Sequence, residues 1–254
     1  MLPEPIFLTV HMYGVMIAVG LISALSVWTA YGKKEGMKEE TLDFVYYNII
    51  AAVAVGFVTA AFFQGLYDYI EDPSAGFHMS VDNITFIGGL IGGVLSYFTG
   101  YFIFKKKIPD RLSDILTIMP CCITIAHGFG RVGCFFAGCC YGKPTDSFLG
   151  VKFPYLPCRV HPTQLYEAGF LFIMFAVFSV LLYKKRGRYN FPVYLSSYGV
   201  FRFFLEYLRD DARGSFIGSI TPSQFWSLVM IAGGLVLAAV IYRKEHHSNE
   251  PESL

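Results

Sequence analysis

Long apolar segments, separated by short polar ones, run through the whole chain. Each is close to the roughly 20 residues that a helix needs to cross the hydrocarbon layer of a bilayer. Backbone amides within lipid must pair inside their own segment, which favours helices. The pattern therefore predicts an all-α, polytopic membrane bundle of about seven transmembrane helices in one domain, residues 1–254. The expected helices are residues 10–31, 44–66, 84–104, 112–130, 164–183, 191–208 and 222–242.

The charges of the connecting segments indicate how the chain crosses the membrane. Basic residues follow the first, third, fifth and seventh expected helices, whereas the segment 67–82 after the second is acidic. Positively charged loops stay in the cytoplasm, so we expect the N-terminus outside, the C-terminus in the cytoplasm and an extracytoplasmic, cysteine-containing loop at residues 131–163. Residues 245–254 are expected to form a polar, disordered cytoplasmic tail. No cleavable leader is evident at the start, so the first helix is expected to remain.

The composition supports a membrane protein and gives little information about partners. Of the 254 residues, 54% are hydrophobic and only 15% are charged, where a soluble domain usually has about a quarter charged residues. Lysines and arginines lie at helix ends and do not form a basic face interleaved with aromatic residues, so no nucleic-acid partner is expected.

Several charged side chains fall at or near lipid depth, where ionic groups are costly and default to functional hypotheses. Arg131 ends the fourth expected helix, and Arg202 and Glu206 lie four residues apart on one face of the sixth. Tyr198 precedes Arg202 by one turn, and Arg209 follows Glu206. One interpretation is a structural Arg202–Glu206 pair. Together with Arg131, these groups favour a site for an anionic headgroup, because guanidinium donates two parallel hydrogen bonds to phosphate.

Histidines and glycines near Arg131 offer further candidate chemistry. His127 shares a helical face with Arg131 and suits proton transfer near neutral pH, or it orders the loop through hydrogen bonds. Residues 128–134 are dense in glycine, which allows backbone to approach a ligand or allows the helix to break. Gly88 and Gly89 belong to a run of small residues whose ordinary role is close helix packing.

Four cysteines lie in the expected outer loop, and two more, Cys121 and Cys122, are expected to be buried in the fourth helix. Disulfides are the favoured interpretation of the loop thiols, subject to the redox state of the compartment. A metal site with His127 or His161 is less favoured, because the spacing contains no paired Cys-x2-Cys. Catalytic or free thiols remain alternatives, and no metal or cofactor is expected. The loop cysteines are Cys134, Cys139, Cys140 and Cys158.

Six ordered motifs resemble those of the bacterial prolipoprotein diacylglyceryl transferases. Gly-Arg-Val-Gly-Cys-Phe at 130–135, followed by Gly142, is similar to the family signature Gly-Arg-x-Gly-Asn-Phe-x-Asn-x-Glu-x-x-Gly. His-Met-Tyr-Gly at 11–14 and His-Pro-Thr-Gln-Leu-Tyr-Glu at 161–167 also match. The remaining matches lie at 85–92, 198–209 and 221–224, so the resemblance covers nearly the whole chain.

The resemblance implies transfer of the diacylglyceryl group of phosphatidylglycerol to the lipobox cysteine thiol of a prolipoprotein, giving a thioether and glycerol phosphate. It implies a bacterial cell membrane enzyme with its site toward the outer side, and membrane lipids and the prolipoprotein signal peptide as partners. Arg202, Tyr198, His127, Tyr13 and Glu206 are the expected catalytic residues. The expected phospholipid-binding residues are Arg131, Gly130, Gly133, Gly142, Arg209, Gly88 and Gly89.

The chain departs from the family pattern at five places, one of them near residues 59–61 of the second expected helix, where the family often carries an arginine. Ile87 stands where the family has a histidine, Cys134 and Ala137 stand for two asparagines, and Cys139 stands for a glutamate. Two alternatives therefore accompany the main interpretation. One is a paralogous phospholipid-dependent transferase with another acceptor, and the other is a non-catalytic lipid-binding or thiol protein.

Overall fold

The computed structural model describes residues 11–79, 85–209 and 220–247, and this part of the chain is mostly helical. It contains seven α-helices, which confirms the predicted all-α class. Five of them, α1, α2, α4, α5 and α7, are long and apolar enough to cross a membrane. The helices are α1 Met12–Glu35, α2 Glu39–Glu71, α3 Phe86–Phe104, α4 Leu112–Ala137, α5 Thr163–Tyr183, α6 Asn190–Leu205 and α7 Pro222–His247.

Several of the predicted boundaries are wrong. α1 ends at Glu35 and not at 31, and α2 spans Glu39–Glu71 and not 44–66. α4 continues to Ala137, so the segment 131–137 is helical and does not begin the loop. The glycines there do not break the helix, because their missing side chains admit neighbours: a Cβ on Gly133 would lie 3.2 Å from the Tyr13 ring of α1. The helix ends at Gly138, whose φ of 72° favours glycine. At the other end of the chain, residues 245–247 belong to α7, and the rest of the expected disordered tail lies outside the described residues.

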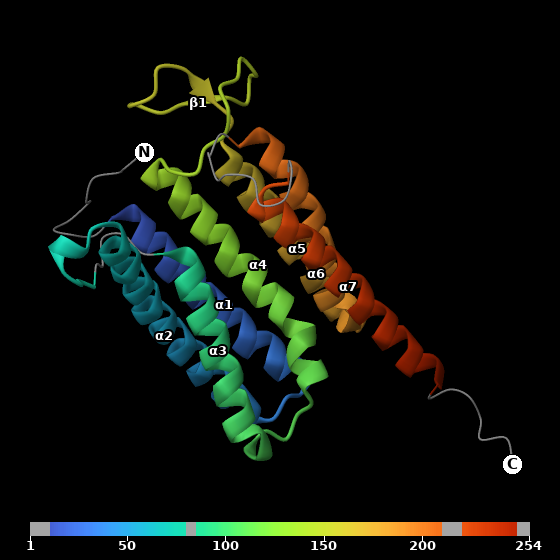
Figure 1. The fold of residues 1–254 in the computed structure, drawn as a ribbon. Coiled ribbons are helices and arrows are strands. Elements are labelled where there is room, and N and C mark those ends of the chain that lie inside the picture. Colours follow the sequence, from blue (N-terminus) through green and yellow to red (C-terminus); the bar gives the residue numbers. More distant parts are fainter. Residues whose placement is uncertain (1–10, 80–84, 210–219, 248–254) are drawn as a thin grey trace, which may run out of the picture. The chain divides into compact units, whose positions relative to one another are not determined.

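The chain divides into two compact units. The first, residues 1–28 and 112–254, contains the start of α1 together with α4 to α7. In it α4 packs along α5, and α6 packs along α7 (Figure 1). α4 also contacts α6, so the three helices α4, α5 and α6 have facing surfaces on which polar side chains can meet.

The second unit, residues 29–111, is built around the α2–α3 pair (Figure 1). Small residues allow the two backbones to approach: a Cβ on Gly89 would lie 3.1 Å from the Gly56 carbonyl oxygen, and one on Gly88 would lie 2.7 Å from the Phe63 Cβ. Gly88 and Gly89 therefore pack within this unit, as small residues commonly do between membrane helices, and their expected place at the phospholipid stays a prediction.

The connection between α4 and α5 carries a short antiparallel pair, β1 Val151–Lys152 and β2 Arg159–Val160. The Arg159 guanidinium donates to the Gly150 carbonyl at 2.6 and 2.9 Å and so closes the hairpin. Phe153 is fully buried beneath it against Phe135 and Tyr141. The connection is thus a folded substructure fixed to the end of α4.

Adjacent glycines in α7 provide a matched test of the α6–α7 packing. A Cβ on Gly234 would meet the Ser196 hydroxyl of α6 and lie 2.7 Å from the Pro192 carbonyl oxygen, whereas one on Gly233 would meet nothing within 4 Å. We expect Gly234→Ala to lower the free energy of unfolding by about 1–3 kcal/mol through overpacking. Gly233→Ala should be neutral or stabilising, because alanine is the better helix former. Thermal unfolding in detergent micelles measures both, and equal midpoints would contradict the packing described here.

Candidate active site between α4, α5 and α6

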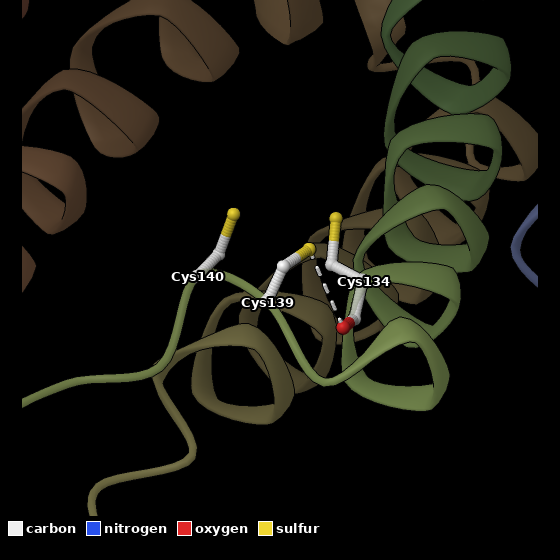
Figure 2. A group of neighbouring side chains, drawn as sticks. All are labelled: Cys134, Cys139 and Cys140. Atoms are coloured by element: carbon white, nitrogen blue, oxygen red, sulfur yellow. Dashed lines mark hydrogen bonds between the residues drawn. The ribbon is translucent and has the colours of Figure 1, made fainter. Parts of the chain in front are cut away.

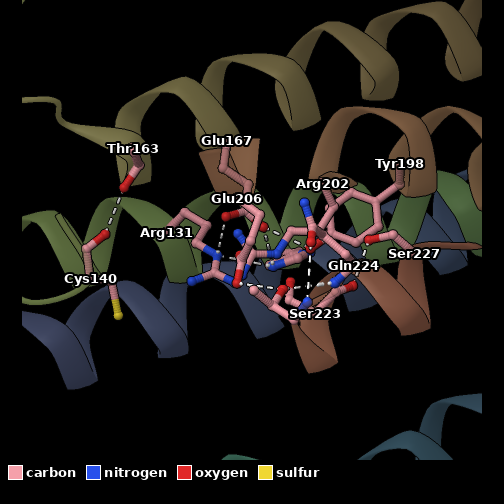
Figure 3. Close-up of polar contacts among 12 residues, drawn as sticks. Arg131, Cys140, Thr163, Glu167, Tyr198, Arg202, Glu206, Ser223, Gln224 and Ser227 are labelled. Carbon is pink, nitrogen blue, oxygen red and sulfur yellow. Dashed lines mark hydrogen bonds and ion pairs between the residues drawn. The ribbon is translucent and has the colours of Figure 1, made fainter. Parts of the chain in front are cut away.

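A fully buried carboxylate, Glu167 on α5, lies at the centre of the first unit. The Tyr198 hydroxyl of α6 donates a hydrogen bond to its Oε1 at 2.7 Å. From α4, Arg131 Nε lies 3.1 Å from Oε2, and His127 Nε2 lies 3.6 Å from Oε1. Figure 3 shows Arg131, Glu167 and Tyr198 converging from three helices. A carboxylate buried in this way is tolerated only when it is paired and hydrogen-bonded, so these contacts explain its presence.

His127 and Arg131 lie one turn apart on α4 and contact each other directly. The single Nε–H of Arg131 donates to His127 Nε2 at 3.3 Å, which assigns Nε2 as an acceptor and the imidazole as neutral. The Arg131–Glu167 contact is consequently an ion pair outside hydrogen-bond geometry, and Glu167 Oε2 has no hydrogen bond within the described residues. The two α4 side chains are 27% and 19% exposed, so a ligand can reach them.

A second ion pair extends the network along α6. Arg202 Nη2 lies 3.2 Å from Glu206 Oε2 with both side chains buried, as the spacing of four residues predicts. Glu206 Oε1 accepts from the Thr221 hydroxyl at 3.1 Å, and Thr221 in turn pairs with Gln224 at the start of α7. Arg202 Nη1 is buried and makes no hydrogen bond to any described residue. A buried unfilled donor costs free energy, and an anionic oxygen would satisfy it.

The remaining predicted residues lie around this network. Tyr13 is 38% exposed on α1 and packs beside Gly133, and Gly130 has open space on its Cβ side. Gly142 forms a backbone bridge with Arg209, which is buried just after α6. Only Gly88 and Gly89 belong to the other unit.

Sequence reasoning missed Glu167 as a site residue, although it is the hub of the network. The signal was present: Glu167 ends the matched motif at 161–167 and is the one carboxylate within a long apolar helix. A charge at that depth is a functional hypothesis by the same argument that identified Arg202.

Three cysteines gather where α4 ends (Figure 2). The Sγ atoms of Cys134, Cys139 and Cys140 all lie within 4.8 Å of one another. All six cysteines of the chain are free, so the favoured disulfides are not present. Hydrogen bonds from the Cys134 and Cys139 thiols lower the pKa of the Cys140 thiol, and the positive charge of Arg209 lowers it further. The pKa of the Cys139 thiol is raised, chiefly by its hydrogen bonds with Cys134 and Cys140.

Comparison with known proteins connects this arrangement to a family. A family model described as prolipoprotein diacylglyceryl transferase matches residues 4–240. The chain belongs to this family. It is 34% identical to the phosphatidylglycerol–prolipoprotein diacylglyceryl transferase of Clostridium tetani, over 90% of this chain and 92% of the relative.

Two further relatives extend the comparison. The chain is 31% identical to phosphatidylglycerol–prolipoprotein diacylglyceryl transferase 2 of Clostridium perfringens, over 91% of this chain and 90% of the relative. It is also 31% identical to the phosphatidylglycerol–prolipoprotein diacylglyceryl transferase of Azotobacter vinelandii, over 94% of this chain and 92% of the relative. The resemblance read from the six motifs is therefore confirmed along nearly the whole of this family member.

Proposed function

We propose that this family member transfers the diacylglyceryl group of phosphatidylglycerol to the lipobox cysteine thiol of a prolipoprotein and releases glycerol phosphate. The observation that carries the proposal is a pair of intramembrane arginines, each held beside a buried carboxylate: Arg131 beside Glu167, and Arg202 beside Glu206. Fixed cations in a low-dielectric site suit a reaction whose leaving group is a phosphate.

Each of these residues has its own role in the proposed reaction. Arg202, with an unfilled Nη1 donor, binds the headgroup phosphate together with Arg131. Glu167 orients Arg131 and the Tyr198 hydroxyl. When phosphate takes the Arg131 donors, His127 Nε2 becomes available to accept the proton of the attacking thiol. The thiolate sulfur forms a bond to the glyceryl carbon, the carbon–oxygen bond to phosphate breaks, and the proton ends on the released glycerol phosphate.

The membrane setting follows from the same proposal. The chain is a multi-pass membrane protein, and we place it in the bacterial cell membrane. The basic residues that follow α1, α3, α5 and α7 favour a cytoplasmic location for those helix ends. This pattern supports an outer location for the C-terminal ends of α4 and α6, where a prolipoprotein presents its signal peptide. The diacyl tails would remain among the helices, so the lipid need not leave the bilayer to react.

Complementation tests the activity and the acceptor together. The gene is expressed in a bacterium depleted of its own diacylglyceryl transferase, and conversion of a model prolipoprotein is followed on a gel. We expect conversion with the wild-type chain and none with a matched prolipoprotein whose lipobox cysteine is serine. Absence of conversion from well-expressed, membrane-inserted protein would reject the prolipoprotein acceptor and leave a transferase with another acceptor.

A further inference from the structure

We propose that Cys134, Cys139 and Cys140 bind one Zn²⁺ as three thiolates, and that the fourth coordination position binds the acceptor thiol. The second half of this inference rests on the function proposed above, whereas the metal site itself does not. The spacing Cys-x4-Cys-Cys is not that of a paired zinc knuckle, which is why the sequence alone did not favour it.

The sulfur geometry is close to that of a three-thiolate zinc site. A tetrahedral Zn²⁺ with bonds of about 2.3 Å separates its sulfur ligands by roughly 3.8 Å. The three Sγ atoms already lie within 4.8 Å of one another, so small side-chain rotations close the site. Figure 2 shows the three side chains extending to the same side of the turn that follows α4.

The backbone that carries the three thiols is fixed by its neighbours. Gln164 Nε2 donates to the Cys139 carbonyl at 2.5 Å, and the Thr163 hydroxyl donates to the Cys140 carbonyl at 2.7 Å. Gln164 and Thr163 are both buried at the start of α5. Cys140 itself adopts a φ of 65°, an uncommon conformation for a residue other than glycine. Its side chain extends in the same direction as that of Cys134. A frame held from a second helix keeps the ligands assembled before a metal binds.

The number of ligands indicates an open site. Within the described residues, the group contains three cysteines and no fourth histidine, cysteine or carboxylate. Structural zinc sites use four protein ligands, whereas catalytic ones use three and leave a position for water or substrate. The Cys139 thiol is exposed, so a ligand can approach from outside the helices.

The place of the cluster suits an incoming thiol. Cys134 follows Arg131 by three residues on α4, so the two side chains share a face. On the other side, Gly142 pairs with Arg209 at the end of α6. A zinc-bound acceptor thiol would therefore stand beside the arginines that hold the phosphate. Coordination deprotonates the thiol, and its proton passes through water to His127. The sulfur then leaves the metal and forms its bond to the glyceryl carbon while the carbon–oxygen bond to phosphate breaks, and His127 returns the proton to the released glycerol phosphate.

Metal analysis is the direct test. The full-length protein is purified in micelles under reducing conditions, and its zinc is measured by mass spectrometry. We expect about one zinc per chain in the wild type. The zinc content should fall by about tenfold or more in each of the variants Cys134→Ser, Cys139→Ser and Cys140→Ser. Cys158→Ser, in the same loop but outside the cluster, and Cys121→Ser, buried within α4, are the controls that should retain it. Zinc-free wild type, copper in place of zinc, or a disulfide within the cluster would overturn the site.

Cobalt substitution tests the open position without relying on activity or on variants. Zinc is removed from the wild-type chain with a chelator and replaced by Co²⁺, whose near-ultraviolet band reports thiolate ligands. A lipobox peptide should change the cobalt spectrum, and its cysteine-to-serine counterpart should not. Equal spectra with both peptides would overturn acceptor binding. Diacylglyceryl transfer by the fully metal-free enzyme would refute the catalytic role of the metal and leave the proposed function in place. A cobalt site that responds to the peptide thiol in a chain without transfer activity would refute the proposed function instead.

Discussion

Replacing Arg202 with glutamine is expected to lower the rate of diacylglyceryl transfer by about 100- to 1,000-fold, the usual effect of removing one fixed donor to a developing negative charge. Arg202 is buried, and its Nη1 has no hydrogen-bond partner among the described residues. Glutamine retains a donor and loses the charge, so phosphate binding and leaving-group stabilisation both suffer. Transfer from labelled phosphatidylglycerol to a lipobox peptide, measured in micelles, gives the rate.

Two further variants separate charge from shape at this position. Arg202→Lys keeps a cation and loses the planar fork, so its rate should lie between those of wild type and Arg202→Gln. Arg243→Gln removes an exposed arginine from the last turns of α7 and should leave the rate unchanged. The unfolding midpoint of each variant is measured alongside. A folded Arg202→Gln protein with normal transfer would show that Arg202 only pairs with Glu206 and takes no part in binding phosphate.

Five of the seven described helices were predictable because each of them satisfies a single strong requirement. A run of about 20 apolar residues is readable without any tertiary contact. The Arg202–Glu206 pair was predictable for a similar reason, since residues four apart on a helix are neighbours whatever surrounds them. The structure adds Thr221 and Gln224 to that pair, a contact between segments that no local pattern foretells.

The end of α4 was not predictable from local preference. Glycine allows a helix to break, residues 128–134 are dense in glycine, and the predicted helix ended at 130. The helix continues because Gly133 admits Tyr13 of α1, and a Cβ on Gly128 would press on the Phe172 ring of α5. Here packing between helices decides a boundary that propensity alone places earlier.

The cysteine cluster was missed for the same reason. With the helix ending early, Cys134 was expected in the outer loop together with Cys139, Cys140 and Cys158, and disulfides among these four were favoured. The extra turns of α4 and the turn through Gly138 instead bring Cys134 to Cys139 and Cys140 and leave Cys158 outside the group. A few residues of helix thus change a set of disulfide candidates into a set of metal ligands.

Glu167→Gln, at the centre of the polar network, is expected to lower the free energy of unfolding by about 3–5 kcal/mol. It should also lower the rate of diacylglyceryl transfer by about 100-fold or more. The carbonyl of glutamine can still accept from Tyr198, but its amide would face the Arg131 cation, which loses its counter-charge. The chain offers a close control. Glu245 also pairs with an arginine and a tyrosine, Arg188 at 3.0 Å and Tyr189 at 2.7 Å, in a more exposed setting. Glu245→Gln should lower the free energy of unfolding by at most about 1 kcal/mol and leave the rate of transfer unchanged.

The double variant Arg131→Met with Glu167→Gln distinguishes a purely structural role of the Arg131–Glu167 pair from a role in binding phosphate. It removes both charges of the Arg131–Glu167 pair at once, so the unfolding free energy should recover much of what Glu167→Gln loses, because no uncompensated charge remains. Transfer should stay at the low level, since the cation that binds phosphate is gone. Stability and transfer would recover together only if Arg131 and Glu167 did no more than hold α4 to α5, and that result would leave Arg202 as the sole phosphate ligand of the proposed site.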